Sequence, residues 1–358
     1  MEQWIIDKLK EREAQGTLRS LANAKLPIDF WSNDYLGFAS DPVKADIAGS
    51  TGSRLVSGNN SDVDRLEQFL CQHYHAPSAL VFNSGYDANI GLMSSLGQRG
   101  TTILYDELVH ASIRDGIRLG PGKSYSFRHN DLEDLKQRIE RSEGQCMVVV
   151  ESVYSMDGDR APLEDIAALC ATMDTHLIVD EAHAVGVFGE LGAGLCSTHI
   201  HTMARVVTFS KAWGRMGAAV LGSENLRSYL INFARSFIYT TGLPGGICNA
   251  IETVQTRHDE IKEAQARLAY IGEYFQAEAE KRRLGFIDHR SPIRSYLIEG
   301  NIFARKLADA CNARGIAVKA MLSPTVPAGT ERLRVCLHSY NTKEEVNLLL
   351  ETIKEHAR

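Results

Sequence analysis

Short apolar segments alternate with helical patterns along the middle of the chain, and this alternation limits the possible folds more than any other feature of the sequence. The apolar segments lie at residues 79–82, 102–105, 146–151, 176–180, 205–209 and 218–221. Helical patterns at 63–75, from the turn at 83–86 to about 96, at 110–119 and at 163–173 separate or precede them. Strands that are apolar on both faces and alternate with helices are typical of a sheet buried on both sides. We therefore expect an α/β fold with a mostly parallel sheet flanked by helices.

The two ends of the chain follow a different pattern. Residues 3–15 predict an opening helix, and residues 246–283, which lack proline and are rich in Glu, Lys, Ala and Arg, predict one or two helices. Strand patterns then follow at 293–298, 316–318 and 332–337, with helices at 302–313 and from Thr342. We expect a large α/β domain over residues 41–245, and a smaller α+β domain that combines residues 1–40 with 246–358.

Charge and hydropathy exclude several classes of partner. The chain has 39 Lys and Arg against 45 Asp and Glu, a net charge of −6, so nucleic acid and anionic membrane surfaces are not expected partners. No segment approaches the roughly 18 apolar residues of a membrane span. Charged residues occur too early after Met1 for a secretory signal peptide. We expect a cytoplasmic protein with no membrane contact.

Cysteine and histidine spacing gives no sign of a disulfide framework or a metal site. The seven cysteines are scattered and form no C-x-x-C, which favours a reducing compartment. The pairs His73/His75 and His199/His201 lack nearby cysteines or carboxylates. We therefore expect no metal.

Common nucleotide-binding and hydrolase motifs are absent. No G-x-G-x-x-G follows an expected strand, because Ser197 stands where a third glycine would follow Gly192 and Gly194. The Gly122-Lys123-Ser124 segment has Ile117 where a P-loop needs glycine, and we interpret it as an ordinary turn. A G-x-S-x-G nucleophile elbow is also missing.

Three segments carry residues with a shared chemistry. The strand at 176–180 is followed by His183 and ends in Asp180, the strand at 205–209 leads to Lys211, and Ser84-Gly85-Tyr86 forms a turn into a helix. In open α/β sheets, ligands bind at the carboxyl ends of the strands, where all three segments lie. A lysine amine, a carboxylate and a helix N-terminus that binds phosphate are the groups that pyridoxal phosphate requires. Each residue alone has an ordinary structural interpretation, and it is their order that favours the cofactor.

These segments resemble the α-oxoamine synthases, which are fold-type-I pyridoxal phosphate enzymes. The resemblance covers nearly the whole chain and rests on matching motifs at 32–37, 52–58, 127–131, 151–159, 180–183, 208–211, 239–244 and 324–330. It implies a transferase fold of that type, and an enzyme that condenses an amino acid with an acyl thioester and releases carbon dioxide.

The resemblance implies a role for each matching residue in cofactor binding. Lys211 matches the Schiff-base lysine, His110 the histidine stacked on the ring, Asp180 the partner of the pyridine nitrogen, and His183 the partner of the phenolic oxygen. Further cofactor-binding positions are matched by Gly85, Tyr86, Ser155 and Thr208 and, toward the phosphate of a neighbouring subunit, by Thr240 and Thr241. The last pair implies a homodimer.

The substrate positions follow from the same resemblance. Asn33 and Arg334 match residues that hold the amino acid carboxylate, whereas Arg19 and Thr325 match residues near the acyl end. The compact N-terminal region and the motifs near residues 217–221 and 324–327 resemble the biotin-pathway members, which join L-alanine to a pimeloyl thioester carried by coenzyme A or acyl carrier protein. Leu322 is a departure, since an arginine is common at that position.

Other interpretations remain open at this point. Other α-oxoamine synthases, such as a glycine C-acetyltransferase, a serine-using synthase or a synthase of quorum signals or long-chain acyl products, share every cofactor residue. A non-catalytic regulator with an aminotransferase-like domain is the alternative from a different class. Such regulators often lack the lysine or add a DNA-binding segment, whereas this chain has Lys211 and no basic appendage.

Overall fold

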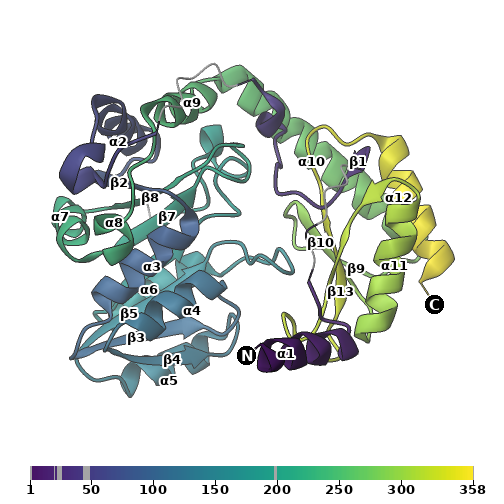
Figure 1. Ribbon diagram of the computed structural model, residues 1–358, viewed down its shortest axis with the longest axis horizontal. Coiled ribbons are helices and arrows are strands. Elements are labelled where there is room, and N and C mark those ends of the chain that lie inside the picture. The colour runs from purple at the N-terminus through teal and green to yellow at the C-terminus, as the bar shows by residue number, and fades with distance from the viewer. Residues whose placement is uncertain (1, 20, 22–25, 43–48, 197–199, 358) are drawn as a thin grey trace. The chain divides into compact units, whose positions relative to one another are not determined.

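The computed structural model describes residues 2–19, 21, 26–42, 49–196 and 200–357. His199 lies outside the described residues. The chain forms two compact units (Figure 1), which we describe separately. The sheet unit comprises Leu36–Ser155 and Arg160–Gln265, and the terminal unit comprises Met1–Tyr35, Met156–Asp159 and Ala266–Arg358. The boundaries expected at 40/41 and 245/246 stay predictions.

Seven described strands form the sheet of the sheet unit, in the spatial order β2-β8-β7-β6-β5-β3-β4. Their bounds are β2 Ser78–Phe82, β3 Thr101–Asp106, β4 Lys123–Phe127, β5 Gln145–Glu151, β6 His176–Asp180, β7 Ala204–Thr208 and β8 Ala218–Gly222. All pairings are parallel except those of β8, which runs antiparallel to both β2 and β7. Every residue of β2 and β7 is buried, as expected for strands covered on both faces.

Helices of the sheet unit pack on this sheet and on one another. Their bounds are α2 Ser61–His73, α3 Gly85–Leu96, α4 Ala111–Leu119, α5 Leu132–Glu140, α6 Leu163–Thr172, α7 Glu224–Phe233, α8 Arg235–Ile238 and α9 Gly245–Gln255, with short helical turns at Phe38–Ser40, Arg54–Gly58 and Glu190–Gly192. Helix α3 contacts β7 and β8 and lies beside α4, α7 and α8, whereas α5 and α6 contact each other and strands β4 and β6. The large apolar core lies between these helices and the strands.

The terminal unit is an α+β arrangement. Its four-stranded antiparallel sheet has the order β12-β13-β10-β9, and β1 pairs with β11. The elements are α1 Gln3–Ala14, β1 Ile28–Asp29, β9 Phe286–Ile287, β10 Ile293–Leu297, α11 Asn301–Ala313, β11 Ile316–Ala317, β12 Lys319–Met321, β13 Arg332–Cys336 and α12 Lys343–His356. Helix α10, His258–Lys281, begins in the sheet unit and ends in this one. None of the described helices is both long and apolar enough to cross a membrane.

The fold class predicted from the sequence is confirmed, with local corrections. The expected turn at 122–124 is wrong for Lys123 and Ser124, because both residues belong to β4. Strand β4 lies at the edge of the sheet and alternates exposed and half-buried residues, so it lacks the continuous apolar run used as the strand signal. Helices α5, α7 and α8 were not anticipated, since their sequences are short and polar on one side. Residues 246–283 contain most of α9 and all of α10, with a break between Gln255 and His258.

Candidate active site

The carboxyl ends of four strands meet at one edge of the seven-stranded sheet. Phe82 at the end of β2 and Thr208 at the end of β7 both pair with Ala218, the first residue of β8. Asp180 at the end of β6 pairs with Val206 on one side and with Glu151, the last residue of β5, on the other. This edge is therefore where the expected ligand site of an open α/β sheet lies.

The N-terminus of α3 lies at the same edge of the sheet. Ser84 is its N-cap, and the Ser84 hydroxyl oxygen accepts the backbone N–H of Asp87 at 3.1 Å. A Cβ added to Gly85 would lie 3.6 Å from the Thr208 side chain, so Gly85 directly faces the end of β7. The first backbone N–H groups of a helix have no acceptor within the helix, and they favour anions such as phosphate. The Tyr86 hydroxyl, in contrast, donates to Asp115 at 2.7 Å, toward α4.

Asp180 is a buried carboxylate with both oxygens bonded. Oδ1 accepts the backbone N–H of Ala182 at 2.9 Å, and Oδ2 accepts the side-chain amide of Asn89 at 2.7 Å. Asp180 is only 6% exposed and Asn89 only 3%. Both carboxylate oxygens of Asp180 are therefore held in place by hydrogen-bond donors.

His110 caps the N-terminus of α4 and lies beside two charged groups. Its ring nitrogen Nδ1 accepts the backbone N–H of Ser112 at 3.2 Å. Burial lowers the pKa of His110, and the positive charge of Lys211 lowers it further, whereas Asp180 acts in the opposite direction. The imidazole is therefore held in its neutral form more strongly than an exposed histidine.

Glu151 supports His110 from the end of β5. A carboxylate oxygen of Glu151 accepts the backbone N–H of His110. Glu151 is 3% exposed. Burial, together with the charge of Asp180 on the neighbouring strand, raises the pKa of Glu151 to about 8. Glu151 is thus predominantly protonated at neutral pH.

Lys211 and His183 follow the strands β7 and β6. Lys211 lies in a tight turn in which its carbonyl accepts the backbone N–H of Gly214 at 3.0 Å. The Thr208 hydroxyl, at the start of this turn, donates to the carbonyl of Gly217 at 3.2 Å and lies 3.1 Å from the Ser210 hydroxyl. His183 is buried. Ser155, half-buried, ends the first stretch of the sheet unit.

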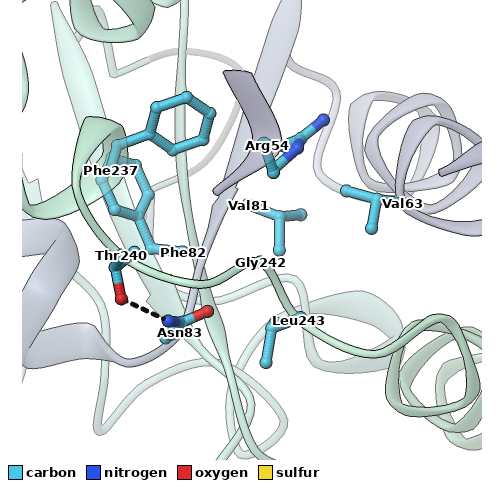
Figure 2. Close-up of a pocket in the computed structure, with 9 residues that line it drawn as sticks. All are labelled: Arg54, Val63, Val81, Phe82, Asn83, Phe237, Thr240, Gly242 and Leu243. Atoms are coloured by element: carbon cyan, nitrogen blue, oxygen red, sulfur yellow. Dashed lines mark hydrogen bonds between the residues drawn. The ribbon is translucent and has the colours of Figure 1, made fainter. Parts of the chain in front are cut away.

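Thr240 and Thr241 are tied to the turn that precedes α3. The side-chain amide of Asn83 donates to the Thr240 hydroxyl at 3.0 Å and to the Thr241 carbonyl at 2.9 Å. Figure 2 shows the first of these bonds beside a small cavity of about 10 Å³, which is lined by apolar side chains together with Arg54, Asn83 and Thr240. The 240–241 segment is therefore held against the turn at Asn83, even though both threonines are partly or fully exposed.

The predicted substrate residues all belong to the terminal unit. The guanidinium of Arg334 donates to the Asn33 side-chain oxygen at 3.0 Å, and the Tyr35 hydroxyl donates to the same oxygen at 3.1 Å. Arg334 is 7% exposed, so it is a buried cation that faces a neutral amide. A cation of this kind suits the carboxylate of a small substrate.

The predicted acyl-end residues are held more weakly. Arg19 donates to the Thr325 hydroxyl at 3.4 Å, and both residues are exposed. Leu322 is half-buried, close in sequence to the cis peptide bond between Ser323 and Pro324.

The sheet unit holds a set of side chains that fits pyridoxal phosphate. It combines a buried, hydrogen-bonded carboxylate, a lysine near the same strand ends, two histidines and a helix N-terminus beside a threonine hydroxyl. No cluster of three or more metal-ligating side chains occurs in the part of the chain that the structure describes. The arrangement can bind a phosphate ester, protonate a pyridine ring opposite Asp180, and place an amine beside it.

Three residues of this edge were missed from the sequence: Asn89, Ser112 and Glu151. Asn89 is a buried amide in an otherwise apolar stretch of α3, four residues after Gly85, so helical spacing places it on the same side as the phosphate-binding turn. Glu151 ends an apolar strand as Asp180 does. Glu151 could have been found as a polar residue that ends an apolar strand, whereas the neighbours that give Asn89 its role are visible only in the structure.

Comparison with known proteins agrees with this geometry. Residues 26–353 match the family model for aminotransferase class I and II. The chain is 38% identical to the 8-amino-7-oxononanoate synthase of Emericella nidulans, over 91% of this chain and 88% of the relative. It is likewise 38% identical to that of Chromohalobacter salexigens, over 96% and 93%.

Solved structures give the same result. A serine palmitoyltransferase from S. paucimobilis, described as holding a pyridoxal phosphate–myriocin adduct, matches with a TM-score of 0.90 and 27% identity, over 100% of this chain and 97% of that one. An 8-amino-7-oxononanoate synthase from Francisella tularensis matches with a TM-score of 0.79 and 30% identity, over 92% and 97%. The chain therefore belongs to the aminotransferase class I and II family and, within it, to the 8-amino-7-oxononanoate synthases.

Proposed function

We propose that this chain condenses L-alanine with a pimeloyl thioester to give 8-amino-7-oxononanoate, carbon dioxide and the free thiol, a step of biotin biosynthesis. The observation that carries the proposal is identity of 35–38% with synthases of this name over nearly the full chain. The enzyme is a pyridoxal phosphate-dependent acyltransferase, and the buried set around Asp180 and Lys211 supports that cofactor. When bound, pyridoxal phosphate supplies an electron-withdrawing ring that stabilises negative charge at the amino acid Cα.

Different residues of the sheet unit bind different parts of this cofactor. The backbone N–H groups of Gly85 and Tyr86 bind the phosphate, with Thr208 beside them. Asp180 keeps the proton on the pyridine nitrogen, and His110 packs on the ring. Further contacts come from the remaining predicted positions, namely His183, Ser155, Thr240 and Thr241. The hydrogen bonds of Asp180 and the cap at Ser84 support the first two of these roles.

Lys211 then moves the protons of the reaction. Its amine removes the Cα proton of alanine, and Cα forms a bond to the thioester carbonyl carbon while the carbon–sulfur bond breaks. The thiolate leaves and takes up a proton. The bond between Cα and the original carboxylate then breaks, carbon dioxide leaves, and Lys211 returns a proton to Cα. His183 donates a hydrogen bond to the new ketone during this loss.

The substrate residues are assigned by charge. Arg334 and Asn33 hold the carboxylate of alanine, and the buried guanidinium of Arg334 beside the Asn33 amide supports this assignment because a guanidinium binds a carboxylate through paired hydrogen bonds. Arg19 and Thr325 contact the acyl end. The carrier, coenzyme A or acyl carrier protein, is the other half of the thioester.

Assembly and location complete the proposal. We propose a homodimer in which Thr240 and Thr241 reach the phosphate site of the partner, and a cytoplasmic enzyme. All seven cysteines are free, which supports a reducing compartment.

Mixed dimers of Lys211→Ala with a Thr240→Ala/Thr241→Ala variant should regain activity. No recovery after proven subunit exchange would contradict a shared site.

The function is tested by measuring thiol release and product mass. The purified, cofactor-loaded protein is offered L-alanine, glycine or L-serine, each with pimeloyl-CoA, acetyl-CoA or octanoyl-CoA. We expect the fastest coenzyme A release, and a product of the mass of 8-amino-7-oxononanoate, from L-alanine with pimeloyl-CoA. Preference for glycine with acetyl-CoA, or for L-serine with a long acyl chain, would overturn the proposal in favour of another α-oxoamine synthase.

A further inference from the structure

A chain of hydrogen bonds connects Asp180 to His110 through two residues that have not been given a role. The amide nitrogen of Asn89 lies 2.7 Å from Asp180 Oδ2 and 3.0 Å from the Ser112 hydroxyl oxygen. That hydroxyl oxygen lies 2.8 Å from His110 Nδ1. Asn89 and Ser112 are 3% and 1% exposed, so water does not compete for these bonds.

The direction of every bond in this chain is determined. A carboxylate can only accept, so the Asn89 nitrogen donates one hydrogen to Asp180 and its other hydrogen to the Ser112 oxygen. The Ser112 hydroxyl oxygen could still accept a second hydrogen, so the roles of that hydroxyl and of His110 Nδ1 follow from a further bond. The backbone N–H of Ser112 also points at Nδ1, at 3.2 Å, and a backbone N–H can only donate. Nδ1 is therefore an acceptor, and the ring proton resides on Nε2.

We propose that Asn89 and Ser112 are positioning residues: Asn89, held by Asp180, donates to the Ser112 hydroxyl and strengthens it as a donor to Nδ1, which fixes His110 as a neutral imidazole with its proton on Nε2. The inference rests on the proposed function in one respect, namely that His110 packs on the cofactor ring and Asp180 faces the pyridine nitrogen. A neutral His110 adds no positive charge that would compete with the pyridine nitrogen for Asp180. The Nε2 proton also gives His110 a donor on the side of the ring away from Ser112.

The charged groups around His110 are consistent with this assignment. Lys211 follows β7 and disfavours a second positive charge, whereas Asp180 at the end of β6 and Asp115 on α4 favour one. Glu151, at the end of β5, accepts the backbone N–H of His110 and is mostly protonated at neutral pH. Burial opposes protonation of the ring as well, and it is the largest influence on the pKa of His110.

The test is NMR of the cofactor-loaded protein labelled with ¹⁵N-histidine, with His110 assigned by loss of its signals in His110→Gln. Wild-type His110 should show the Nε2–H tautomer across pH 6 to 8. Ser112→Ala removes one donor to Nδ1, and we expect the pH at which His110 protonates to rise by about 0.5 to 1 unit. Asn89→Leu should raise it as well, although Asn89 does not touch the imidazole.

The double variant shows whether Asn89 affects His110 through Ser112 or whether the two residues affect His110 independently. If Asn89 acts through Ser112, Asn89→Leu with Ser112→Ala should shift the titration no further than Ser112→Ala alone. Ser112→Thr keeps the hydroxyl and should titrate as the wild type does. Ser95→Ala is the matched control, because Ser95 is a buried serine whose hydroxyl bonds only within α3, to the Leu92 carbonyl at 3.1 Å.

Two results would overturn the inference. One is an Nδ1–H tautomer or an imidazolium form of His110 in the wild type at pH 7. This measurement uses only the wild-type protein, so it does not depend on whether any variant folds. The other is additive shifts, or no shift in a folded Asn89→Leu protein whose Ser112→Ala counterpart does shift. Neither readout uses a substrate, so a failure of the proposed condensation reaction would be seen separately, in the thiol-release assay.

Discussion

Two regions of the molecule that carry predicted site residues differ sharply in how those residues are held. The predicted cofactor residues lie at one edge of the seven-stranded sheet, which we call the cofactor edge. There, Asp180, Asn89 and Ser112 are buried and joined by hydrogen bonds of 2.7 to 3.0 Å. At the acyl-end segment of the terminal unit, Arg19 and Thr325 are exposed and share one bond of 3.4 Å.

This difference predicts that substitutions in the two regions will have effects of different size. A buried charge that loses a partner costs several kcal/mol, because water cannot replace the missing group. An exposed pair contributes about 0.2–1 kcal/mol. Substitutions at the cofactor edge should therefore stop the reaction, whereas substitutions at the acyl-end segment should only change the preference among acyl donors.

The largest effect is expected from Lys211→Ala. Its amine both holds the cofactor and transfers the Cα proton, so kcat should fall by about 10³-fold or more. Lys123→Ala is the matched control, since Lys123 is an exposed lysine at the start of β4 that pairs with Glu143. Borohydride reduction followed by peptide mass spectrometry should label Lys211. A label on another lysine would show that the assignment is wrong.

Asp180→Asn should have the next largest effect. A neutral amide cannot hold the proton of the pyridine nitrogen, and the loss of this charge pair in a buried site corresponds to about 10²-fold or more in rate. The measurement is the exchange of the alanine Cα proton for deuterium, followed by NMR without any acyl donor. Exchange at the wild-type rate in a cofactor-loaded variant would contradict the role of Asp180.

Much of the sheet unit could be predicted, because its strands and the turns that follow them are specified by short, contiguous segments of the sequence. Strands such as β6 and β7 are short apolar runs, and Asp180 and the Lys211 turn follow directly from where those runs stop. Strand β4 was missed, because an edge strand is buried on one side only and its alternating sequence resembles a turn. The antiparallel direction of β8 was likewise not foreseen, since burial on both faces looks the same in either direction.

The hydrogen bonds between the site residues could not be predicted from the sequence, for a different reason. Asn89 on α3, Ser112 on α4 and Asp180 at the end of β6 lie far apart along the chain, and the packing of these three elements brings them together. The role of a polar residue in a helix depends on what faces it, and helical spacing alone does not supply that. The substrate residues Asn33 and Arg334 were predicted from resemblance, and their mutual hydrogen bond became visible only in the structure.

Glu151→Gln should change the pH dependence of stability rather than the rate of the chemical step. The pKa of Glu151 is about 8 in the folded protein, above the ordinary glutamate value of 4.5. The unfolded chain therefore releases this proton at lower pH, and the free energy of unfolding should fall between about pH 5 and 8, by at most about 1.36 kcal/mol per unit. The amide keeps an oxygen for the His110 N–H and does not titrate, so the decline should become shallower.

Urea unfolding at pH 5, 6, 7 and 8 measures this slope. Glu143→Gln is the control, because Glu143 is an exposed glutamate paired with Lys123, and its loss should leave the decline across this range unchanged. Equal slopes for the wild type and Glu151→Gln would show that Glu151 does not hold its proton at neutral pH.

The smallest effect, and the sharpest test of the acyl-end segment, is expected from Leu322→Arg. Pimeloyl-CoA has a terminal carboxylate, and the segment offers it Arg19 and solvent but no cation at position 322. A second, half-exposed cation should lower KM for pimeloyl-CoA by about twofold to fivefold, equivalent to about 0.4–1 kcal/mol. KM for heptanoyl-CoA, which has the same chain length without the charge, should not change. Leu322→Gln controls for the loss of the apolar side chain. If the wild type instead used octanoyl-CoA better than pimeloyl-CoA and Leu322→Arg reversed that order, Leu322 would be a selector for uncharged chains, and the acyl donor of this enzyme would be a fatty thioester rather than a dicarboxylic one.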